Sequence, residues 1–404
     1  MNKGESASAE KGNHFQRYVN YASSLLENYK GSEPFHLYLK KYFSLNKKHG
    51  SKDRKIITSI CYDYFRLGFG VSSDLDVAEK FLLATFLVEN VPSAFLEKLK
   101  PAWNERVGEN ILSKIYLIKE LFNAETIFPF KDELSNEIAS EKFNLSFLIQ
   151  PKLFVRIRPG KEMVVLQKLK TANITFEKLS NLCLAFSNNE KVSTVLWIDK
   201  EVVIQDYNSQ RTEDLLKEQL QLNGSKISIW DCCAASGGKS ILVHDIFKNI
   251  ELTVSDTRKS ILQNLKSRFE NADITNYTSF IADLSVSEPL KEIENPFDII
   301  IADVPCSGSG TWTRTPEQLS FFDKKEIKKY VELQQKIVAN ALPYLKEGGF
   351  FLYITCSVFK KENEENVRFI QQNTTLQLMK SEYLKGYEMQ ADTLFVALFS
   401  KKAK

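Results

Sequence analysis

The feature that most constrains this chain is a regular alternation of short apolar runs and amphipathic segments from residue 224 to the end. The apolar runs expected to form strands are 227–231, 251–256, 279–283, 297–305 and 350–357, with one more at 394–399. The helical segments between them are 258–271, 324–345 and 363–372, with another starting near Lys239. Repeated strand–helix units of this length predict an α/β domain with a parallel, doubly wound sheet, which we place at residues 223–404.

Three further parts precede this domain. Residues 1–14 are small, polar and charged without periodicity, and they predict a flexible tail. Residues 15–140 place apolar side chains three and four apart, the spacing of amphipathic helices, and predict an all-helical domain. Residues 141–222 mix apolar runs, among them 193–199 and 202–206, with a helical pattern, and they predict a small α+β unit.

Composition places the chain in a broad class only. With 404 residues, two or three domains are expected, and a net charge of +3 fits a nucleic-acid partner without requiring one. The polar start and the lack of a long apolar run predict a cytoplasmic protein without a membrane partner. The six cysteines lack C-x-x-C spacing, so neither a metal site nor disulfides are expected.

The chemistry is expected where the parallel strands end, because doubly wound sheets bind ligands beyond the carboxyl ends of their strands. Four of the five predicted strands end on an acid, and a cysteine lies at or just past the end of the last two. The side chains that this rule selects, beyond the first loop, are Asp256, Asp283, Asp303, Cys306 and Cys356.

The loop after the first strand, DCCAASGGKS at 231–240, is a candidate for binding an anionic or nucleoside group. Gly237 and Gly238 allow close approach of the backbone and open a helix whose N-terminal amides attract anions. Cys233 stands where a Walker A loop has Gly, so an NTPase is disfavoured. The candidate cofactor-binding residues of this loop are Cys233, Ala234, Ala235, Ser236, Gly237, Gly238 and Lys239.

Asp256 and Asp283 end the second and third predicted strands. An acid at the end of the second strand commonly accepts hydrogen bonds from a ribose diol, and the adenine of a nucleoside cofactor would lie near the third. Each alone is equally well explained as a helix N-cap. Together, in consecutive units, they favour a nucleoside cofactor.

Cys306 and Cys356 indicate the reaction. If the fourth and fifth strands are neighbours, as is usual, the two thiols face one cleft beside Asp303. A single cysteine of this kind is most often a buried structural residue. Two cysteines at the active ends of adjacent strands favour catalysis.

These residues resemble the NSUN/Sun-type (RsmB-like) RNA cytosine-5 methyltransferase family. The motif-bearing segments are DCCAASGGKS (231–240), DVPCSGSGTWTRTP (303–316), the stretch 333–367 containing ITCS and ENE, and VVIQDYNSQ (202–210). The helical segment 50–68 resembles, more loosely, the NusB-like RNA-binding domain found in this family. Two positions depart from the family pattern: Ser236 replaces a Pro, and DTLFVALF differs from the usual D-G-F-F form.

The resemblance implies a class I (Rossmann-like) methyltransferase fold, S-adenosylmethionine as cofactor and RNA as substrate, ribosomal RNA of the small subunit first. It implies that Cys356 attacks carbon 6 of a cytosine, that Cys306 assists release of the adduct, and that Asp303 binds the base next to the cofactor. It also suggests RNA contacts for Gln205, Asp206 and Arg314 and for the 141–222 unit. No obligate protein partner is implied.

Several alternatives stay open. Transfer RNA enzymes share the catalytic motifs, and the chain could be an inactive RNA-binding protein with a methyltransferase fold. A small-molecule or protein methyltransferase would need no cysteine pair. In DNA cytosine methyltransferases the nucleophile follows the fourth strand in a P-C motif, which Cys306 imitates. The sequence does not decide whether Lys239 contacts the cofactor or the substrate.

Overall fold

The chain forms two compact units in a computed structural model that describes residues 3–219, 226–247 and 249–402. The first unit comprises Met1–Asp132, Ala139–Gln150 and Trp312–Asp323, and the second comprises Glu133–Ile138, Pro151–Thr311 and Lys324–Lys404. The predicted boundary at residues 222 and 223 lies outside the described residues, and the division into four parts stays a prediction. No helix in the described part of the chain has the length and apolar character needed to cross a membrane.

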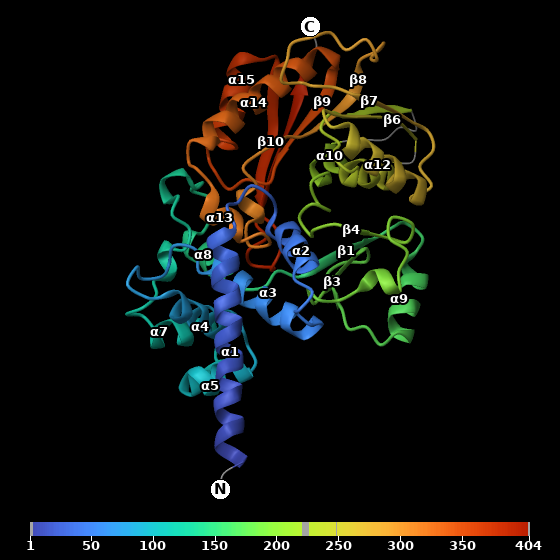
Figure 1. Cartoon of the computed structure of the whole chain (residues 1–404). Coiled ribbons are helices and arrows are strands. Elements are labelled where there is room, and N and C mark those ends of the chain that lie inside the picture. The colour runs from blue at the N-terminus through green and yellow to red at the C-terminus, as the bar shows by residue number, and fades with distance from the viewer. Residues whose placement is uncertain (1–2, 220–225, 248, 403–404) are drawn as a thin grey trace. The chain divides into compact units, whose positions relative to one another are not determined.

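The first unit is helical (Figure 1), as the amphipathic spacing predicts. Its helices are α1 (Lys3–Asn28), α2 (Phe35–Leu45), α3 (Ser51–Arg66), α4 (Val77–Val88), α5 (Ala94–Leu99), α6 (Pro101–Arg106), α7 (Ile111–Leu117), α8 (Ser140–Ser146) and α13 (Glu317–Phe321). Helix α1 begins at Lys3 and so runs through most of the segment 1–14, whose flexibility stays a prediction. That stretch is rich in Ala, Glu and Lys, which favour a helix even without an apolar face.

Arg66 explains why segments distant in sequence join the first unit. Its side chain is 1% exposed and donates hydrogen bonds to the backbone oxygens of Phe147 (3.0 Å) and Thr313 (2.9 Å) and to Gln150 Oε1 (2.9 Å). A buried guanidinium needs several acceptors to offset its lost hydration. This one takes them from Ala139–Gln150 and Trp312–Asp323, so α3 fixes both segments.

The second unit is built on a seven-stranded sheet with the order β10-β11-β9-β8-β5-β6-β7. The strands are β5 (Ile227–Asp231), β6 (Ile250–Asp256), β7 (Tyr277–Ile281), β8 (Phe297–Asp303), β9 (Leu345–Thr355), β10 (Leu376–Leu384) and β11 (Leu394–Lys401). β5 to β9 are mutually parallel, whereas β11 runs antiparallel to both β9 and β10. The predicted doubly wound, mostly parallel sheet is therefore confirmed, and so is the pairing of the fourth and fifth strands, β8 and β9.

Helices flank this sheet (Figure 1). They are α10 (Asp214–Gln219), α11 (Gly238–Ile246), α12 (Lys259–Asn271), α14 (Glu326–Ala341) and α15 (Glu364–Asn373). α11 and α12 pack along β6, while α14 packs on β8 and α15. Ile229, Ile301 and Ile354, from three adjacent strands, are fully buried in the shared core.

A four-stranded antiparallel sheet with the order β2-β3-β1-β4 forms the small α+β part of the second unit. Its elements are β1 (Leu153–Ile157), α9 (Glu162–Thr171), β2 (Glu177–Lys178), β3 (Cys183–Phe186) and β4 (Val202–Ile204). The apolar run 193–199 is not a strand: it forms the 3-10 helix η3 (Val192–Thr194) and a turn. That turn leaves Trp197 exposed on the surface, although the run looks like a buried strand in the sequence.

Candidate functional site

The two predicted catalytic cysteines meet at the carboxyl ends of β8 and β9. The parallel register pairs Asp303 with Ile354, so the residues that follow each strand leave the sheet side by side. Cys306 Sγ lies 3.2 Å from Cys356 Sγ, and the backbone N–H of Cys356 donates to Cys306 Sγ at 3.3 Å. The sequence could suggest this juxtaposition only through an assumed strand order, which the structure supplies.

The Cys306 thiol is held in its neutral form. Its hydrogen bond with Cys356, together with burial, raises the pKa of Cys306 well above its ordinary value. Either sulfur can be the donor of the hydrogen bond between them. The raised pKa makes Cys306 less available as a thiolate, which is the nucleophilic form of a cysteine.

A buried carboxyl group behind the cysteines fixes the two loops that carry them. Glu362 accepts hydrogen bonds from the Ser307 N–H (3.0 Å), from Gln334 Nε2 (2.8 Å) and from Ser357 Oγ (2.7 Å). Burial raises the pKa of Glu362 despite these donors. Sequence reasoning assigned no role to this residue, although its ENE motif was part of the family resemblance.

Gly310 allows the loop after β8 to pass close to the loop after β9. Its N–H donates to the Cys356 backbone oxygen at 2.9 Å, and its own oxygen accepts from the Thr393 N–H at 2.9 Å. A Cβ at this position would lie 2.0 Å from the Thr393 oxygen and 3.0 Å from the Cys356 oxygen. Only glycine fits between these two backbone segments.

Lys239 points from the first turn of α11 towards Asp303. Its Nζ lies 3.4 Å from Asp303 Oδ2 and donates to Ser209 Oγ at 2.7 Å. Burial alone would lower the pKa of Lys239, but Asp303 and Glu213 outweigh it and raise the pKa above its ordinary value. The lysine is therefore a fixed cation beside the carboxyl group predicted to bind the base.

Two further buried carboxyl groups, those of Glu213 and Asp231, interact electrostatically with Lys239, and in the described part of the chain each has one oxygen without a hydrogen bond. Glu213 accepts from Thr212 Oγ1 at 2.6 Å, and Asp231 accepts from Ser240 Oγ at 2.6 Å. Glu213 Oε1 and Asp231 Oδ1 have no hydrogen-bond partner among the described residues. Burial raises the pKa of each group to about 7. Unsatisfied buried oxygens beside an ordered cation are a common property of ligand sites.

The loop from Cys233 to Lys239 has the backbone geometry that the glycines predict. Ala235 has φ +46° and Gly237 has φ +83°, so the chain turns sharply before α11 begins. A Cβ on Gly238 would meet no atom within 4 Å, which leaves open space in front of the helix N-terminus. The Ala234 N–H bonds the Ser255 oxygen at 2.9 Å and so ties the loop to β6.

Ser236, which stands where the family has a Pro, gains a contact instead of leaving the loop loose. Arg268 on α12 donates to the Ser236 backbone oxygen (3.0 Å) and to its Oγ (3.2 Å). The same guanidinium forms a bidentate pair with Asp199 at 2.9 and 2.7 Å. Arg268 on α12 therefore holds the loop through two bonds to Ser236. A proline at this position would offer only its backbone oxygen to Arg268.

Asp256 and Asp283 lie at the carboxyl ends of neighbouring strands, since β6 and β7 pair from Leu252 to Asp256. Asp256 accepts from the Ala235 N–H at 3.1 Å and from Arg258 Nε at 3.0 Å. Burial alone raises its pKa, but these donors hold the pKa below its ordinary value. Asp283 is exposed and accepts from the Ser285 N–H at 2.9 Å. The Arg258 side chain that pairs with Asp256 is 59% exposed, so a ribose diol would compete with it for this carboxyl group.

The residues predicted to line the RNA side have other bonds in the structure. Gln205 accepts from Arg156 Nε (3.0 Å) and donates to Ser209, and Asp206 accepts from the Asp392 N–H (3.0 Å). Arg314 belongs to the first unit. Their contact with RNA stays a prediction. No group of three or more His, Cys, Asp or Glu side chains in the described ranges is arranged to hold a metal ion.

The second half of the chain is similar to one group of known proteins. Residues 218–395 match the family described as 16S rRNA methyltransferase RsmB/F. Ribosomal RNA small subunit methyltransferase B of Photorhabdus laumondii is 31% identical over 183 residues, 45% of this chain and 41% of that protein. The probable enzyme of the same name from Bacillus subtilis is 28% identical over 241 residues, 58% of this chain and 53% of that protein. This chain therefore matches about half the length of these relatives.

Solved structures share the fold. The crystal structure of PH0851 has a TM-score of 0.64 at 18% identity and covers 91% of this chain and 95% of that one. NSun6 from Pyrococcus horikoshii, determined with SFG, has a TM-score of 0.57 at 15% identity and covers 68% of this chain and 97% of that one. The predicted methyltransferase-type fold is thereby confirmed.

Proposed function

Because residues 218–395 match the RsmB/F methyltransferase family, we propose that this chain is an S-adenosylmethionine-dependent RNA methyltransferase. The names of the relatives and the SFG-bound neighbour support an RNA substrate and this cofactor. The open space before α11, the Asp256 carboxyl group and the bent Cys233–Lys239 loop fit such a nucleoside cofactor. When bound, S-adenosylmethionine supplies an electrophilic methyl group on its sulfonium sulfur.

We infer that the product is 5-methylcytosine, formed through a covalent adduct on Cys356. The observation that carries this inference is the pair of thiols 3.2 Å apart at the ends of adjacent strands, one of which ends on Asp303. Carbon 5 of cytosine is a weak nucleophile. Addition of the Cys356 sulfur to carbon 6 moves an electron pair towards carbon 5, which would take the methyl group as its bond to the sulfonium sulfur breaks. A base then takes the proton from carbon 5, the electron pair of that C–H bond restores the ring double bond, and cleavage of the bond between carbon 6 and sulfur frees Cys356.

The surrounding residues have distinct roles in this scheme. Asp303 accepts a hydrogen bond from the amino group of the cytosine, and from the ring nitrogen once that nitrogen carries a proton, which stabilises the charge that develops during attack. Lys239 holds Asp303 in place through the 3.4 Å ion pair, so in this scheme it acts on the substrate side. Cys306 assists the elimination step from its position against the attacking sulfur.

We propose small-subunit ribosomal RNA as the substrate, which the names of the relatives favour over transfer RNA. The test is bisulfite sequencing of both RNA classes from cells with and without the gene. Loss of one methylated cytosine in small-subunit ribosomal RNA supports the proposal. Loss of a methylated cytosine in transfer RNA would instead make transfer RNA the substrate. If no methylated cytosine is lost in either RNA class, the inactive RNA-binding alternative is favoured.

A further inference from the structure

Trp197 is an exposed aromatic ring flanked by two lysines. It is 60% exposed, whereas Trp230 and Trp312 are buried. Lys168 Nζ lies over its ring at 4.6 Å from the centroid, and Lys200 Nζ lies at 5.4 Å. Tryptophan is mostly buried on average, so an exposed indole with two lysine ammonium groups over its ring is a candidate for ligand binding.

Buried bonds fix the turn that presents this ring. The Trp197 N–H donates to Glu201 Oε2 at 3.0 Å, and the Glu201 N–H donates to the Trp197 oxygen at 2.8 Å. Glu201 is only 5% exposed and pairs with Lys168 at 2.7 Å. The backbone under the ring and one of its two lysines are therefore ordered in advance.

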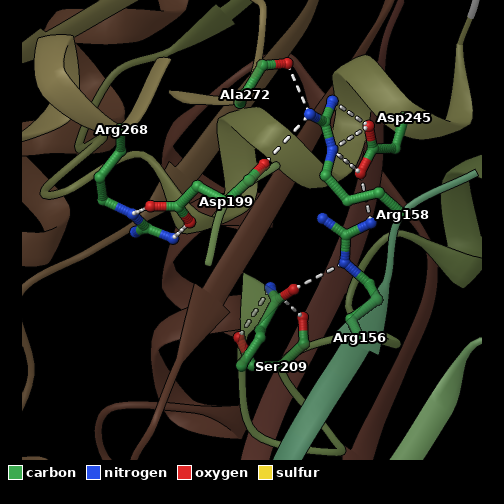
Figure 2. A network of polar contacts seen from close by, with 8 residues as sticks. Arg156, Arg158, Asp199, Ser209, Asp245, Arg268 and Ala272 are labelled. Atoms are coloured by element: carbon green, nitrogen blue, oxygen red, sulfur yellow. Dashed lines mark hydrogen bonds and ion pairs between the residues drawn. The ribbon is translucent and has the colours of Figure 1, made fainter. Parts of the chain in front are cut away.

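The same turn is connected to the candidate cofactor loop. Asp199, which has φ +63°, is paired through both carboxylate oxygens with Arg268 (Figure 2), and its backbone oxygen accepts from Arg158 at 3.1 Å. Arg268 also bonds Ser236 in that loop. The turn that presents Trp197 is therefore connected through Arg268 to the loop proposed to bind the cofactor.

The two lysines differ in their freedom to meet a ligand. Lys168 is tied to Glu201, whereas Lys200 is exposed and has no ion-pair partner within the described part of the chain. A flat π face beside an exposed ammonium group complements a nucleotide, whose base stacks on the ring while its phosphate contacts the cation.

We propose that Trp197, with Lys168 and Lys200, is a stacking platform for an unpaired nucleotide of the substrate RNA. The proposal rests on the proposed function for the identity of the substrate. A target cytosine must leave its stack to reach the cysteines, so unpaired nucleotides are expected in the bound RNA. The platform selects unpaired RNA because a base inside a duplex has no free face.

The test measures binding of a fluorescein-labelled ten-nucleotide RNA of unpaired A and C, alone or annealed to its complement. Trp197→Ala is expected to raise the Kd for the single strand by about 5- to 100-fold and to change duplex binding little. Trp197→Phe, which keeps a ring, loses less. Met163→Ala, which removes an 85% exposed side chain from α9, is the matched control and binds like wild type. Lys200→Ala lowers the salt slope by about 0.7.

Intrinsic fluorescence gives a second readout that needs only folded wild type and Trp197→Phe. RNA quenches the wild-type emission, and the quenched component disappears in the variant. Equal single-strand affinity of wild type and Trp197→Ala, or equal losses on single strand and duplex, overturns the platform. If wild type transfers no methyl group but Trp197 still controls single-strand binding, the proposed function fails and the platform stands. If wild type methylates RNA and Trp197→Ala behaves like wild type in binding and KM, only the platform fails.

Discussion

Glu213 is a fully buried carboxyl group whose protonation is coupled to folding. Burial raises its pKa from 4.5 to about 7, so between these values the native state holds a proton that the unfolded chain releases. The stability that this group contributes is present below about pH 4.5 and is lost as the pH rises through about 7. Glu213→Gln keeps an acceptor for Thr212 and removes the titration.

We therefore expect Glu213→Gln to gain stability relative to wild type as the pH rises from 5 to 8, by up to about 3 kcal/mol. Urea unfolding at several pH values measures this difference. Glu218→Gln, on an exposed side chain of α10, is the control and keeps the wild-type pH dependence. A constant difference between Glu213→Gln and wild type across this range contradicts the assignment of the proton to Glu213.

Also at the residue scale, the sequence predicted the strand-end acids and the two cysteines because their positions follow from where each strand stops. It could not predict their partners. Ser209 reaches Lys239 from thirty residues away, and Glu362 reaches the loop of Cys306 from fifty-five residues away. Such contacts depend on strand order and loop paths, which local patterns do not contain.

At the scale of elements, the turn before α11 contains two neighbouring glycines, Gly237 and Gly238, that differ in backbone conformation and in the space around them. Gly237 has φ +83°, and a Cβ there would lie 2.8 Å from Phe269 Cε1. Gly238 has open space around the same position. We expect Gly237→Ala to destabilise the protein by about 1–3 kcal/mol and Gly238→Ala to be neutral or to stabilise it by up to about 1 kcal/mol.

Thermal unfolding of the two single variants side by side measures this difference. Equal midpoints for Gly237→Ala and Gly238→Ala would show that the left-handed turn is not required for the loop to fold.

The element-scale predictions succeeded where periodicity was strong and failed where tertiary contacts decided. β5 to β9 and β11 follow from apolar runs, but β10 was not predicted because its sequence, LQLMKSEYL, is largely exposed and lacks a clean alternation. Residues 193–199 look like a strand, yet bonds of Glu201 and Asp199 fold them into a turn. The start of α1 depends on helix propensity and not on an apolar face.

At the scale of the whole molecule, buried ion pairs join the small α+β part of the second unit to helix α11 beside the large sheet. Arg156 on β1 and Arg158, the residue after β1, both contact Asp245 on α11, with Arg158 at 2.7 Å, and Asp245 is 4% exposed (Figure 2). Removing the carboxylate leaves two largely buried guanidinium groups without a counter-charge.

Asp245→Asn is therefore expected to lower the free energy of unfolding by about 3–5 kcal/mol. Asp214→Asn, which removes an exposed pair with Lys217, is the control and changes it by less than about 0.5 kcal/mol. Urea denaturation followed by circular dichroism gives both values. A loss for Asp245→Asn as small as that of the control would mean that the α+β part is held to the large sheet mainly by other contacts.

The arrangement of the units was beyond sequence reasoning. Linear segmentation predicts contiguous domains, but the first unit includes Trp312–Asp323, which interrupts the sequence of the second. That segment follows directly on the loop of Cys306 and carries Thr313, whose backbone oxygen binds Arg66. Composition and periodicity give no sign of this contact between residues distant in sequence, so the sequence could not show that Trp312–Asp323 belongs to the first unit.

The central claim is that Cys356 attacks the cytosine and Cys306 assists its release. The most direct test incubates Cys306→Ala and Cys356→Ala with RNA and methyl-labelled S-adenosylmethionine, followed by denaturing electrophoresis. We predict that Cys306→Ala accumulates a labelled protein–RNA adduct, while Cys356→Ala forms neither adduct nor methylated RNA. An adduct on Cys356→Ala, with none on Cys306→Ala, would make Cys306 the nucleophile and contradict this account.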